Sequence, residues 1–313
     1  NPAYPRAVTE MRDDGELCRL SRLRRRKYLN NIYPRLIYCS ITGFGQTGPY
    51  APRPGYDALV QAMGGVMSLT GAPDGLPQKV GIPIADLFAG LYGCIGVLAA
   101  LNHRNATGQG QQIDIGMLDT HVAWLANQGM NYLATGEVPP RLGNQHPDIA
   151  PYQEFPTRDG HIILAVGNDP TFERFCRAFG LAHLPFDERF ATNAVRVAKR
   201  QLVTETLTPV MQSRTTAEWI EALEALKIGC GPINTLEEVF ADPQVQARGC
   251  VIEMPHGSGQ AVQVVANPVR LSETSPEYRL PPPMLGQHTD EVMRDTLGLA
   301  EPEIAELRSK GVI

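Results

Sequence analysis

Residues 81–101 read GIPIADLFAGLYGCIGVLAAL, and this stretch decides how the chain folds around one acidic side chain. Asp86 stands directly ahead of a run without any charge, from Leu87 to Leu101. Glycines at 90, 93 and 96 recur every third residue, so another element can pack closely against that face. The pattern predicts a buried helix over 87–102, and the apolar run is too short to cross a bilayer.

Asp86 has two interpretations at this point. A helix N-terminus favours negative charge, and an apolar helix body would hold the carboxylate rigidly and limit water around it. Such a carboxylate can act as a nucleophile toward an acyl group. Asp is also a preferred N-cap residue, and the local pattern alone favours this ordinary role. The surrounding sequence has to decide between the two.

The composition describes the class of protein. The chain has 313 residues, of which 43% are hydrophobic and 19% charged, as expected for one large globular domain or two ordinary ones. The net charge of -5 argues against a nucleic-acid binder. Six scattered cysteines fit a reducing compartment, and no two histidines have metal-binding spacing. We therefore expect a cytoplasmic protein, or one of the mitochondrial matrix, without a metal or a membrane partner.

Strands and helices alternate in the first part of the chain, which predicts an α/β domain. A glycine motif, Gly43-Phe-Gly-Gln-Thr-Gly48, follows the first predicted strand and matches the dinucleotide fingerprint. Prolines at 49, 52 and 54 come where that fingerprint needs a helix, so the sequence disfavours a dinucleotide site. The predicted elements are strands at 36–41 and 112–117, helices at 56–68 and 87–102, and a mostly helical stretch to 135.

A smaller α+β domain is predicted beyond a linker at Pro139–Asn144. Two capping boxes, Thr215 with Glu218 and Thr235 with Glu238, each predict the start of a helix. The other predicted elements are strands at 161–166, 250–254 and 262–266, helices at 170–179 and 195–213, a short helix from Asp242-Pro243, and two short helices near the end. We therefore predict a large domain over 1–140, a small domain over 141–268, and a tail over 269–313 that returns to the large domain.

Ordered motifs along most of the chain carry a family resemblance. They are Pro34–Pro49, Gly55-Tyr-Asp57, Gly81–Asp86, Leu98–Arg104 with Thr107–Gln111, Arg141–Pro147, Gly160–Asn168, Cys230–Asn234 and Leu285–Asp290. With these motifs the chain resembles the class III CoA-transferases of the CaiB/BaiF type, which include formyl-CoA, carnitine and bile-acid CoA-transferases. The resemblance covers about nine-tenths of the chain from Pro34 onward.

The resemblance implies a fold and a reaction. The fold would be a Rossmann-like large domain, here incomplete at its N-terminus, plus a smaller α+β domain, in an interlocked homodimer. Asp86 would be the catalytic carboxylate, which forms an anhydride with the acyl group and then an aspartyl-CoA thioester. The substrates would be an acyl-CoA donor and a carboxylic acid acceptor. CoA is then a component of the substrate, and no metal or redox cofactor is implied.

The resemblance also implies further site residues. Tyr56 and Met117 fall at positions that line the active site of such transferases. Gly143 and Asn144 match a mobile loop that covers the intermediate. The segment over 141–168 is most similar to family members that act on dicarboxylates, with succinyl-CoA as a donor. Arg53 and Arg141 are candidates to bind the second carboxylate of such an acid, although both are also typical surface arginines.

Two alternatives stay open. The same fold serves α-methylacyl-CoA racemases, which pair the Asp with a His thirty positions earlier, where this chain has Tyr56. Without an imidazole, two-base proton exchange loses a partner, so Tyr56 favours transfer over racemisation. The other alternative is an inactive, truncated family member. The arginine-dense run at 19–27 does not resemble the family segment, which predicts an altered start and weaker CoA binding, or else a basic arm.

Overall fold

The structure is a computed structural model, which describes residues 32–313. Its described part forms two compact units that adjoin in the sequence at Pro232 and Ile233. Neither predicted domain boundary, at 140/141 or at 268/269, coincides with this division, and the three-part arrangement stays a prediction. The arginine-dense run at 19–27 lies outside the described residues.

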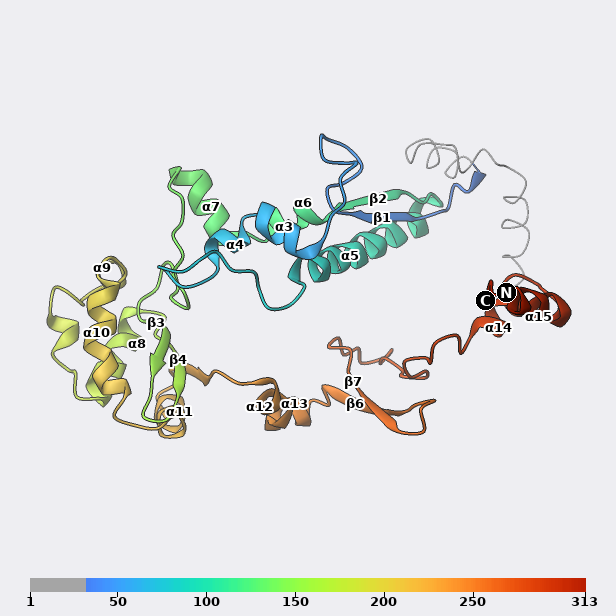
Figure 1. Cartoon of the computed structure of the whole chain (residues 1–313). Coiled ribbons are helices and arrows are strands. Elements are labelled where there is room, and N and C mark those ends of the chain that lie inside the picture. The colour runs from blue at the N-terminus through green and yellow to red at the C-terminus, as the bar shows by residue number, and fades with distance from the viewer. Residues whose placement is uncertain (1–31) are drawn as a thin grey trace. The chain divides into compact units, whose positions relative to one another are not determined.

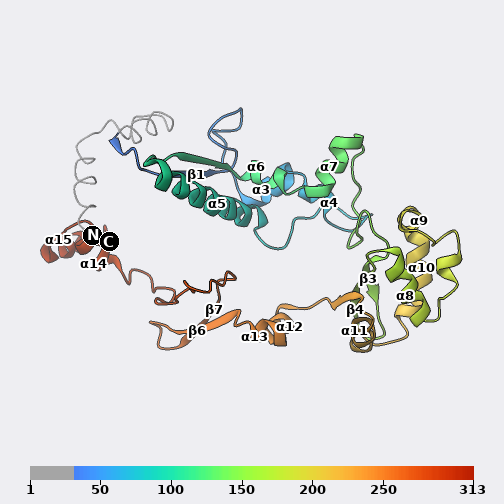
Figure 2. The same ribbon diagram turned by 180° about the vertical axis from the view of Figure 1, so that it is seen from behind.

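The first part of the chain is a strand–helix–strand unit. Strands β1 (Tyr38–Thr42) and β2 (Gln112–Gly116) pair in parallel, with Tyr38 opposite Gln112. Both views show helix α5 running alongside these strands (Figures 1 and 2). The helices of this part are α3 (Asp57–Met63), α4 (Val66–Leu69), α5 (Ile84–Thr107), α6 (Met117–Ala123) and α7 (Ala126–Thr135). The alternation and the helical stretch to 135 are confirmed.

Two glycines interrupt the single helix that was predicted over 56–68. Helix α3 ends at Met63, and Gly65 adopts a positive φ of 90° before α4 begins. Glycine enters this left-handed region at little cost, whereas other residues pay for it sterically. The Gly64-Gly65 pair therefore turns the chain, and one predicted helix becomes two.

Helix α5 approaches the sheet closely through two of the three glycines of the predicted face, Gly93 and Gly96, whereas Gly90 packs against nothing described. A Cβ added to Gly93 would lie 3.2 Å from Cδ1 of Ile41 on β1, and one added to Gly96 would lie 2.9 Å from Cγ2 of Ile113 on β2. The hydrogen of glycine leaves room for both isoleucines. The helix backbone can therefore lie directly against the strands.

The opposite face of α5 is not buried, so the prediction of a buried helix is wrong for that face. Its large apolar side chains are exposed; they are Leu87, Leu91, Ile95 and Leu98. The helix is also longer than predicted, with 24 residues from Ile84 to Thr107. By length and composition α5 could cross a membrane. The prediction that the apolar run is too short to cross a bilayer is therefore wrong. A core helix of a globular protein can have the same composition, and 28% of the apolar window of α5 is buried.

A second sheet organises residues 152–232. Strands β3 (Tyr152–Pro156), β4 (His161–Ala165) and β5 (Gly229–Pro232) pair antiparallel in that order. Strands β3 and β5 were not predicted. The helices of this region are α8 (Asp169–Ala178), α9 (Asn193–Ala198), α10 (Arg200–Met211) and α11 (Thr216–Ala225), with a 3₁₀ turn at Leu184–Phe186. The helix predicted over 195–213 is thus divided into α9 and α10.

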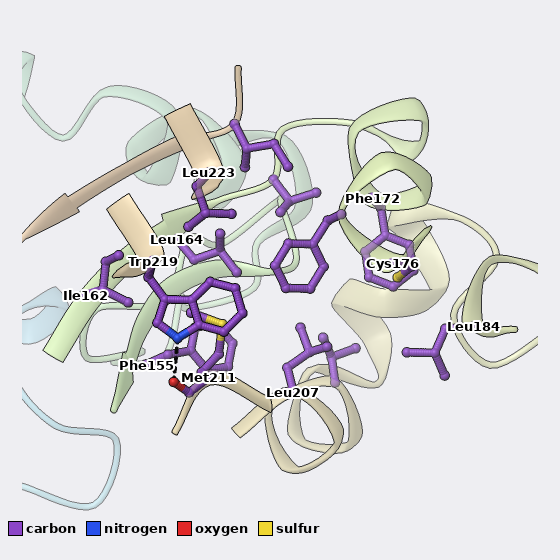
Figure 3. Close-up of a cluster of buried hydrophobic side chains, with 14 of the residues drawn as sticks. Phe155, Ile162, Leu164, Phe172, Cys176, Leu184, Leu207, Met211, Trp219 and Leu223 are labelled. Atoms are coloured by element: carbon purple, nitrogen blue, oxygen red, sulfur yellow. Dashed lines mark hydrogen bonds between the residues drawn. The ribbon is translucent and has the colours of Figure 1, made fainter. Parts of the chain in front are cut away.

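A large apolar core fills this region (Figure 3). Alternate side chains of the strands point inward, among them Phe155 on β3 and Leu164 on β4, both fully buried. Trp219 of α11 is also fully buried, and its indole N–H donates to the carbonyl oxygen of Met211 at 2.6 Å, drawn as a dashed line in Figure 3. Burying aromatic surface while satisfying the indole donor strongly stabilises this region.

The remaining unit, 233–313, has small elements. Strands β6 (Val251–Pro255) and β7 (Ala261–Val265) form an antiparallel hairpin. Its helices are α12 (Leu236–Ala241), α13 (Pro243–Ala247), α14 (Thr289–Glu291), a π-helical turn at Val292–Thr296, and α15 (Glu301–Ser309). The predicted strands and helices of this unit are therefore confirmed. Both predicted capping boxes, Thr215 with Glu218 and Thr235 with Glu238, are also present.

Candidate active site

Asp86 lies inside the first turn of α5 rather than before it. The helix begins at Ile84 with Pro83 as its N-cap, so Asp86 is the third helical residue and makes no cap hydrogen bond. The interpretation of Asp86 as an ordinary N-cap is therefore wrong. The side chain is exposed. The sequence analysis expected the helix to limit water around this carboxylate, and the described residues do not do so. A carboxylate at this position remains favoured by the partial positive charge of the helix N-terminus.

Three helices converge under this first turn. Ala85 and Ala89 of α5 are buried against Val60 of α3 and Met117 of α6, with Ile115 of β2 packed beside them. Met117 is buried, and it begins α6 directly after strand β2. The structure thus brings one predicted site residue, Met117, against the turn that carries Asp86.

Asp57 connects α3 to the same turn. Its Oδ1 accepts a hydrogen bond from the backbone N–H of Ala85 at 2.9 Å. The carboxylate of Asp57 thus bonds the backbone of the turn that carries Asp86. Tyr56, the N-cap residue of α3, precedes Asp57 and has 71% of its surface exposed. Tyr56 therefore lies next to a residue that touches the Asp86 turn, its side chain is largely exposed, and its place in the active site stays a prediction.

The two arginines considered for a second carboxylate have different surroundings. The guanidinium of Arg53 lies over the ring of Tyr50, 4.5 Å from its centroid, and 5.6 Å from that of Phe44. Arg141 donates to the carbonyl oxygen of Gly75 at 2.6 Å and to that of Ala72 at 3.4 Å. Arg141 is thus held by backbone carbonyls, whereas Arg53 is exposed and stacked in a way that leaves its N–H groups accessible.

Gly143 and Asn144 lie in the segment that Arg141 anchors. The N–H of Gly143 donates to the carbonyl oxygen of Gly71 at 3.1 Å, and Gly143 has a positive φ of 59°. The side-chain amide of Asn144 donates to Glu154 at 2.6 Å. These bonds place the 141–144 segment beside the loop that begins at Gly71 and leads to α5. A contact of either residue with Asp86 is not among them.

His121 of α6 is a buried residue near this turn whose surroundings the sequence did not predict. Its side chain is fully buried on α6, and neither ring nitrogen has a hydrogen-bond partner within residues 32–313. Its ring lies so close to Gly64 that a Cβ added there would be 2.5 Å from its Cδ2. Burial lowers the pKa of His121, and the negative charge of Asp57 acts in the opposite direction. His121 is therefore a buried histidine whose ring is not held by hydrogen bonds from the part of the chain that the structure describes.

Cavities and metal clusters give no competing site around Asp86. A cavity of about 540 Å³ lies in the 233–313 unit, lined by residues that include Phe240, Cys250 and Val264. Asp86 is not among its lining residues. Within residues 32–313, no three His, Cys, Asp or Glu side chains cluster in a way that could hold a metal ion.

Known proteins are similar to this chain over most of its length. Residues 19–289 match CoA-transferase family III. The chain is 47% identical over 267 residues to a succinate–glutarate CoA-transferase from Agrobacterium fabrum, covering 85% of this chain and 67% of the relative. It is 38% identical over 285 residues to the human succinyl-CoA:glutarate CoA-transferase, covering 91% of this chain and 65% of the relative.

Solved structures share the fold. The chain superposes with a TM-score of 0.73 on the crystal structure of a CaiB/BaiF family protein from Brucella suis, which is 45% identical, covering 86% of this chain and 70% of that chain. The chain therefore belongs to CoA-transferase family III, as the motifs predicted. Its mixed helix and sheet architecture matches that of CaiB/BaiF proteins. The chain spans about two thirds of the length of the curated relatives that it matches.

Proposed function

We propose that this protein is a CoA-transferase in which Asp86 is the nucleophile that carries CoA between two acids. The observation that carries this proposal is the place of Asp86: an accessible carboxylate in the first turn of an apolar helix, in a chain that belongs to CoA-transferase family III. The relatives named above are CoA-transferases, which supports the same reaction type.

The first half-reaction exchanges one acyl bond for another. An Oδ atom of Asp86 attacks the thioester carbonyl of the donor, the C–S bond breaks, and CoA leaves as the thiolate while a mixed anhydride remains on Asp86. The thiolate then attacks the Asp86 carbonyl of that anhydride. The donor acid leaves as a carboxylate, and an aspartyl-CoA thioester forms. Because the thioester is conserved, no external energy source is needed.

The second half-reaction reverses these steps with another acid. The carboxylate of the acceptor attacks the aspartyl-CoA carbonyl, CoA leaves, and a new anhydride forms. The thiolate attacks the acceptor carbonyl, which gives the acceptor thioester and frees Asp86 as a carboxylate. CoA is a component of the substrates throughout, and the scheme needs neither a metal nor a redox cofactor. The partial positive charge at the N-terminus of α5 favours negative charge that develops at Asp86.

We propose short dicarboxylates as the substrates, with succinyl-CoA as a donor and a C5 acid such as glutarate as an acceptor. The names of two relatives support this choice, since both contain succinate or succinyl-CoA and glutarate. Arg53 is the more accessible of the two candidate arginines for the second carboxylate, because Arg141 is held by backbone carbonyls. A planar guanidinium binds a carboxylate through two parallel hydrogen bonds.

We also propose a homodimer with interlocked subunits, in which the large domain of one subunit and the small domain of the other form the active site. The exposed apolar face of α5, with Leu91 and Ile95, supports coverage by further protein. Membership of family III supports the same arrangement. Sedimentation of the purified chain should give the mass of a dimer, and a monomer at all concentrations would contradict this proposal.

Mass spectrometry tests the reaction directly. The chain is incubated with succinyl-CoA, and the peptide that contains Asp86 is examined before and after addition of glutarate. A CoA adduct on that peptide, discharged by glutarate and absent in Asp86→Ala, is expected. Asp119→Ala is the matched control, because Asp119 is likewise the third residue of its helix, α6, and it should form the adduct normally.

Other outcomes separate the alternatives. If CoA binds but no acyl-CoA gives an adduct, exchange of the α-proton of a 2-methylacyl-CoA becomes the next assay, and positive exchange would favour the racemase reaction. A failure to bind CoA would favour an inactive family member. The presence of Tyr56 where racemases of this fold have a histidine argues against two-base proton exchange.

A further inference from the structure

Two side chains of α3 reach across to the loop that leads to Asp86. Asp57 and Gln61 stand four residues apart, on the same face of the helix, and Gln61 is fully buried. The amide Nε2 of Gln61 donates to Oδ2 of Asp57 at 2.7 Å, so the two side chains hold each other in place. We refer to these two residues as the α3 clamp.

The α3 clamp contacts three points of the segment just before Asp86. Oδ1 of Asp57 accepts the N–H of Ala85 at 2.9 Å. Oε1 of Gln61 accepts the N–H of Val80 at 2.9 Å, and Nε2 of Gln61 also lies 3.4 Å from the carbonyl oxygen of Ile82. Both oxygen atoms of the Asp57 carboxylate and both polar atoms of the Gln61 amide are therefore engaged.

The start of α5 depends on a partner from outside the helix. The first N–H groups of any helix lack internal acceptors, and a side chain at the N-cap normally accepts one of them. Here the N-cap is Pro83, which makes no side-chain cap bond. Asp57, 28 residues earlier in the sequence, accepts from Ala85 in its place. A hydrogen bond to a carboxylate is stronger than one to a neutral acceptor, so this contact fixes the first turn firmly.

From these contacts we infer that Asp57 and Gln61 are positioning residues that aim the Asp86 carboxylate at the thioester carbonyl. The inference rests on the proposed function of Asp86. Asp57 holds the backbone of Ala85, which is joined by one peptide bond to Asp86, so a shift at Ala85 moves the nucleophile with it. A misplacement of about 1 Å can slow an enzyme roughly 100-fold, because the reacting atoms must meet in a narrow range of geometry.

The α3 clamp acts through the backbone, and this makes its role distinguishable from that of a group that binds substrate. Loss of the clamp should lower the rate of the chemical step and leave the affinity for succinyl-CoA nearly unchanged. A merely structural role would lower the stability of the fold without changing the single-turnover rate of the folded fraction. The two roles can therefore be separated by rate, affinity and stability measured on the same variants.

The test uses the full chain and four variants. Asp57→Ala removes the acceptor of the Ala85 N–H, and Asp57→Asn keeps an oxygen at that place without the charge. Gln61→Leu removes the second half of the clamp at similar size. Asp242→Ala is the matched control, because the Asp242 carboxylate also accepts backbone N–H groups at a helix start, those of Gln244 and Val245 in α13. Single-turnover formation of the Asp86–CoA adduct is followed together with hydrogen exchange of the peptide over 80–90.

The expected results differ for each variant. Asp57→Ala should slow adduct formation about 10- to 100-fold with little change in the succinyl-CoA concentration at half-saturation. Faster hydrogen exchange over 80–90 should accompany the slower reaction. Gln61→Leu should act in the same direction, and Asp57→Asn should recover most of the wild-type rate. Asp242→Ala should match wild type in both measurements.

Two results would overturn the inference, and they can be told apart. If wild type forms the adduct and Asp57→Ala forms it at the same rate, Asp57 does not position Asp86, although the proposed function stands. The same conclusion follows if Asp57→Asn is as slow as Asp57→Ala while hydrogen exchange over 80–90 is unchanged in both. If wild type itself forms no adduct, the proposed function is wrong. The positioning role, which rests on that function, is then wrong as well.

Discussion

Residues 38–135, which carry Asp86, and residues 152–232 are built in contrasting ways. The buried cluster around Asp86 has four members, Val60, Ala85, Ala89 and Met117, whereas the cluster of the other region has fifteen. The small cluster relies on alanines and on the glycine contacts of α5 with β1 and β2. The larger one is filled by aromatic and branched side chains around Trp219.

The two regions of the chain are therefore stabilised by different kinds of interaction. Buried apolar area stabilises a fold roughly in proportion to its size, so the apolar core is the main stabilising feature of residues 152–232. Around Asp86, the large side chains of α5 point outward and the polar contacts of Asp57 and Gln61 fix the local geometry. The region with the candidate nucleophile is thus held by directed bonds and close backbone packing rather than by a large core.

The two tryptophans provide the largest test of this comparison. Trp219 is fully buried, and Trp124 of the other region is 47% exposed while it stacks on Phe88. Trp219→Ala should lower the free energy of unfolding by about 3–5 kcal/mol, because it leaves a cavity in the core. Trp124→Ala is the matched control and should cost about 1 kcal/mol. Denaturant unfolding measures both, and equal losses would contradict the contrast between the regions.

Substitution of two glycines of α5 should change the stability of the fold by smaller amounts and in opposite directions. Gly96→Ala should destabilise by about 1–3 kcal/mol, since the new Cβ would lie 2.9 Å from Ile113 and the helix would have to move from β2. Gly90 has no atom within 4 Å of such a Cβ, so Gly90→Ala should stabilise by up to about 1 kcal/mol through helix propensity. Thermal unfolding compares them. Equal effects would show that α5 does not lie against β2 in this way.

The capping box of α11 gives a test of about 1 kcal/mol in the well-packed region. Thr215→Ala removes the hydroxyl that accepts the N–H of Glu218 and should cost about 1 kcal/mol. The N–H of Thr215 in turn lowers the pKa of Glu218 below its ordinary value of 4.5. This contribution is therefore present above pH 4.5 and is lost as the pH falls through the lowered pKa. Glu218→Gln should therefore lower the free energy of unfolding near neutral pH and have little effect in acid, and an equal effect at both pH values would contradict this.

His121 should give the smallest effect, which is a change in how the free energy of unfolding depends on pH. Burial lowers its pKa below 6.5 in the folded chain, so the unfolded chain takes up the proton first as the pH falls. Stability is therefore retained above pH 6.5 and declines below it. His121→Phe keeps a ring and cannot titrate, so it should flatten this decline. His103→Phe, at an exposed position, is the matched control for the replacement of an imidazole by a phenyl ring.

Much of the fold was predictable because its signals are local. The capping threonines and the apolar run of α5 mark element starts and types directly in the sequence. Strand β5 was missed because its residues, Gly229-Cys-Gly-Pro232, have no strand character of their own, and pairing with β4 makes them a strand. Strand β3 ends in Pro156 and follows Pro151, which hid its alternation of exposed and buried side chains. Such tertiary pairing is invisible in a local pattern.

The sequence singles out a candidate nucleophile, but it does not predict the contacts that support the turn carrying it. Asp86 was singled out from its place before an apolar run, and Met117 from the family motifs. The contact of Asp57 with Ala85 spans 28 residues, so only the fold could bring the two together. The start of α5 at Ile84 depends on this distant partner, which is why the sequence put Asp86 at the helix cap rather than inside the first turn.

The most direct measurement of the central claim follows one oxygen atom. Glutarate labelled with oxygen-18 in its carboxylates is supplied with succinyl-CoA, and the peptide containing Asp86 is analysed by mass spectrometry after turnover. The proposed reaction predicts that an acceptor oxygen bridges the second anhydride and remains on Asp86, so the side chain should carry the label. Turnover to glutaryl-CoA with Asp86 unlabelled would contradict Asp86 as the covalent carrier.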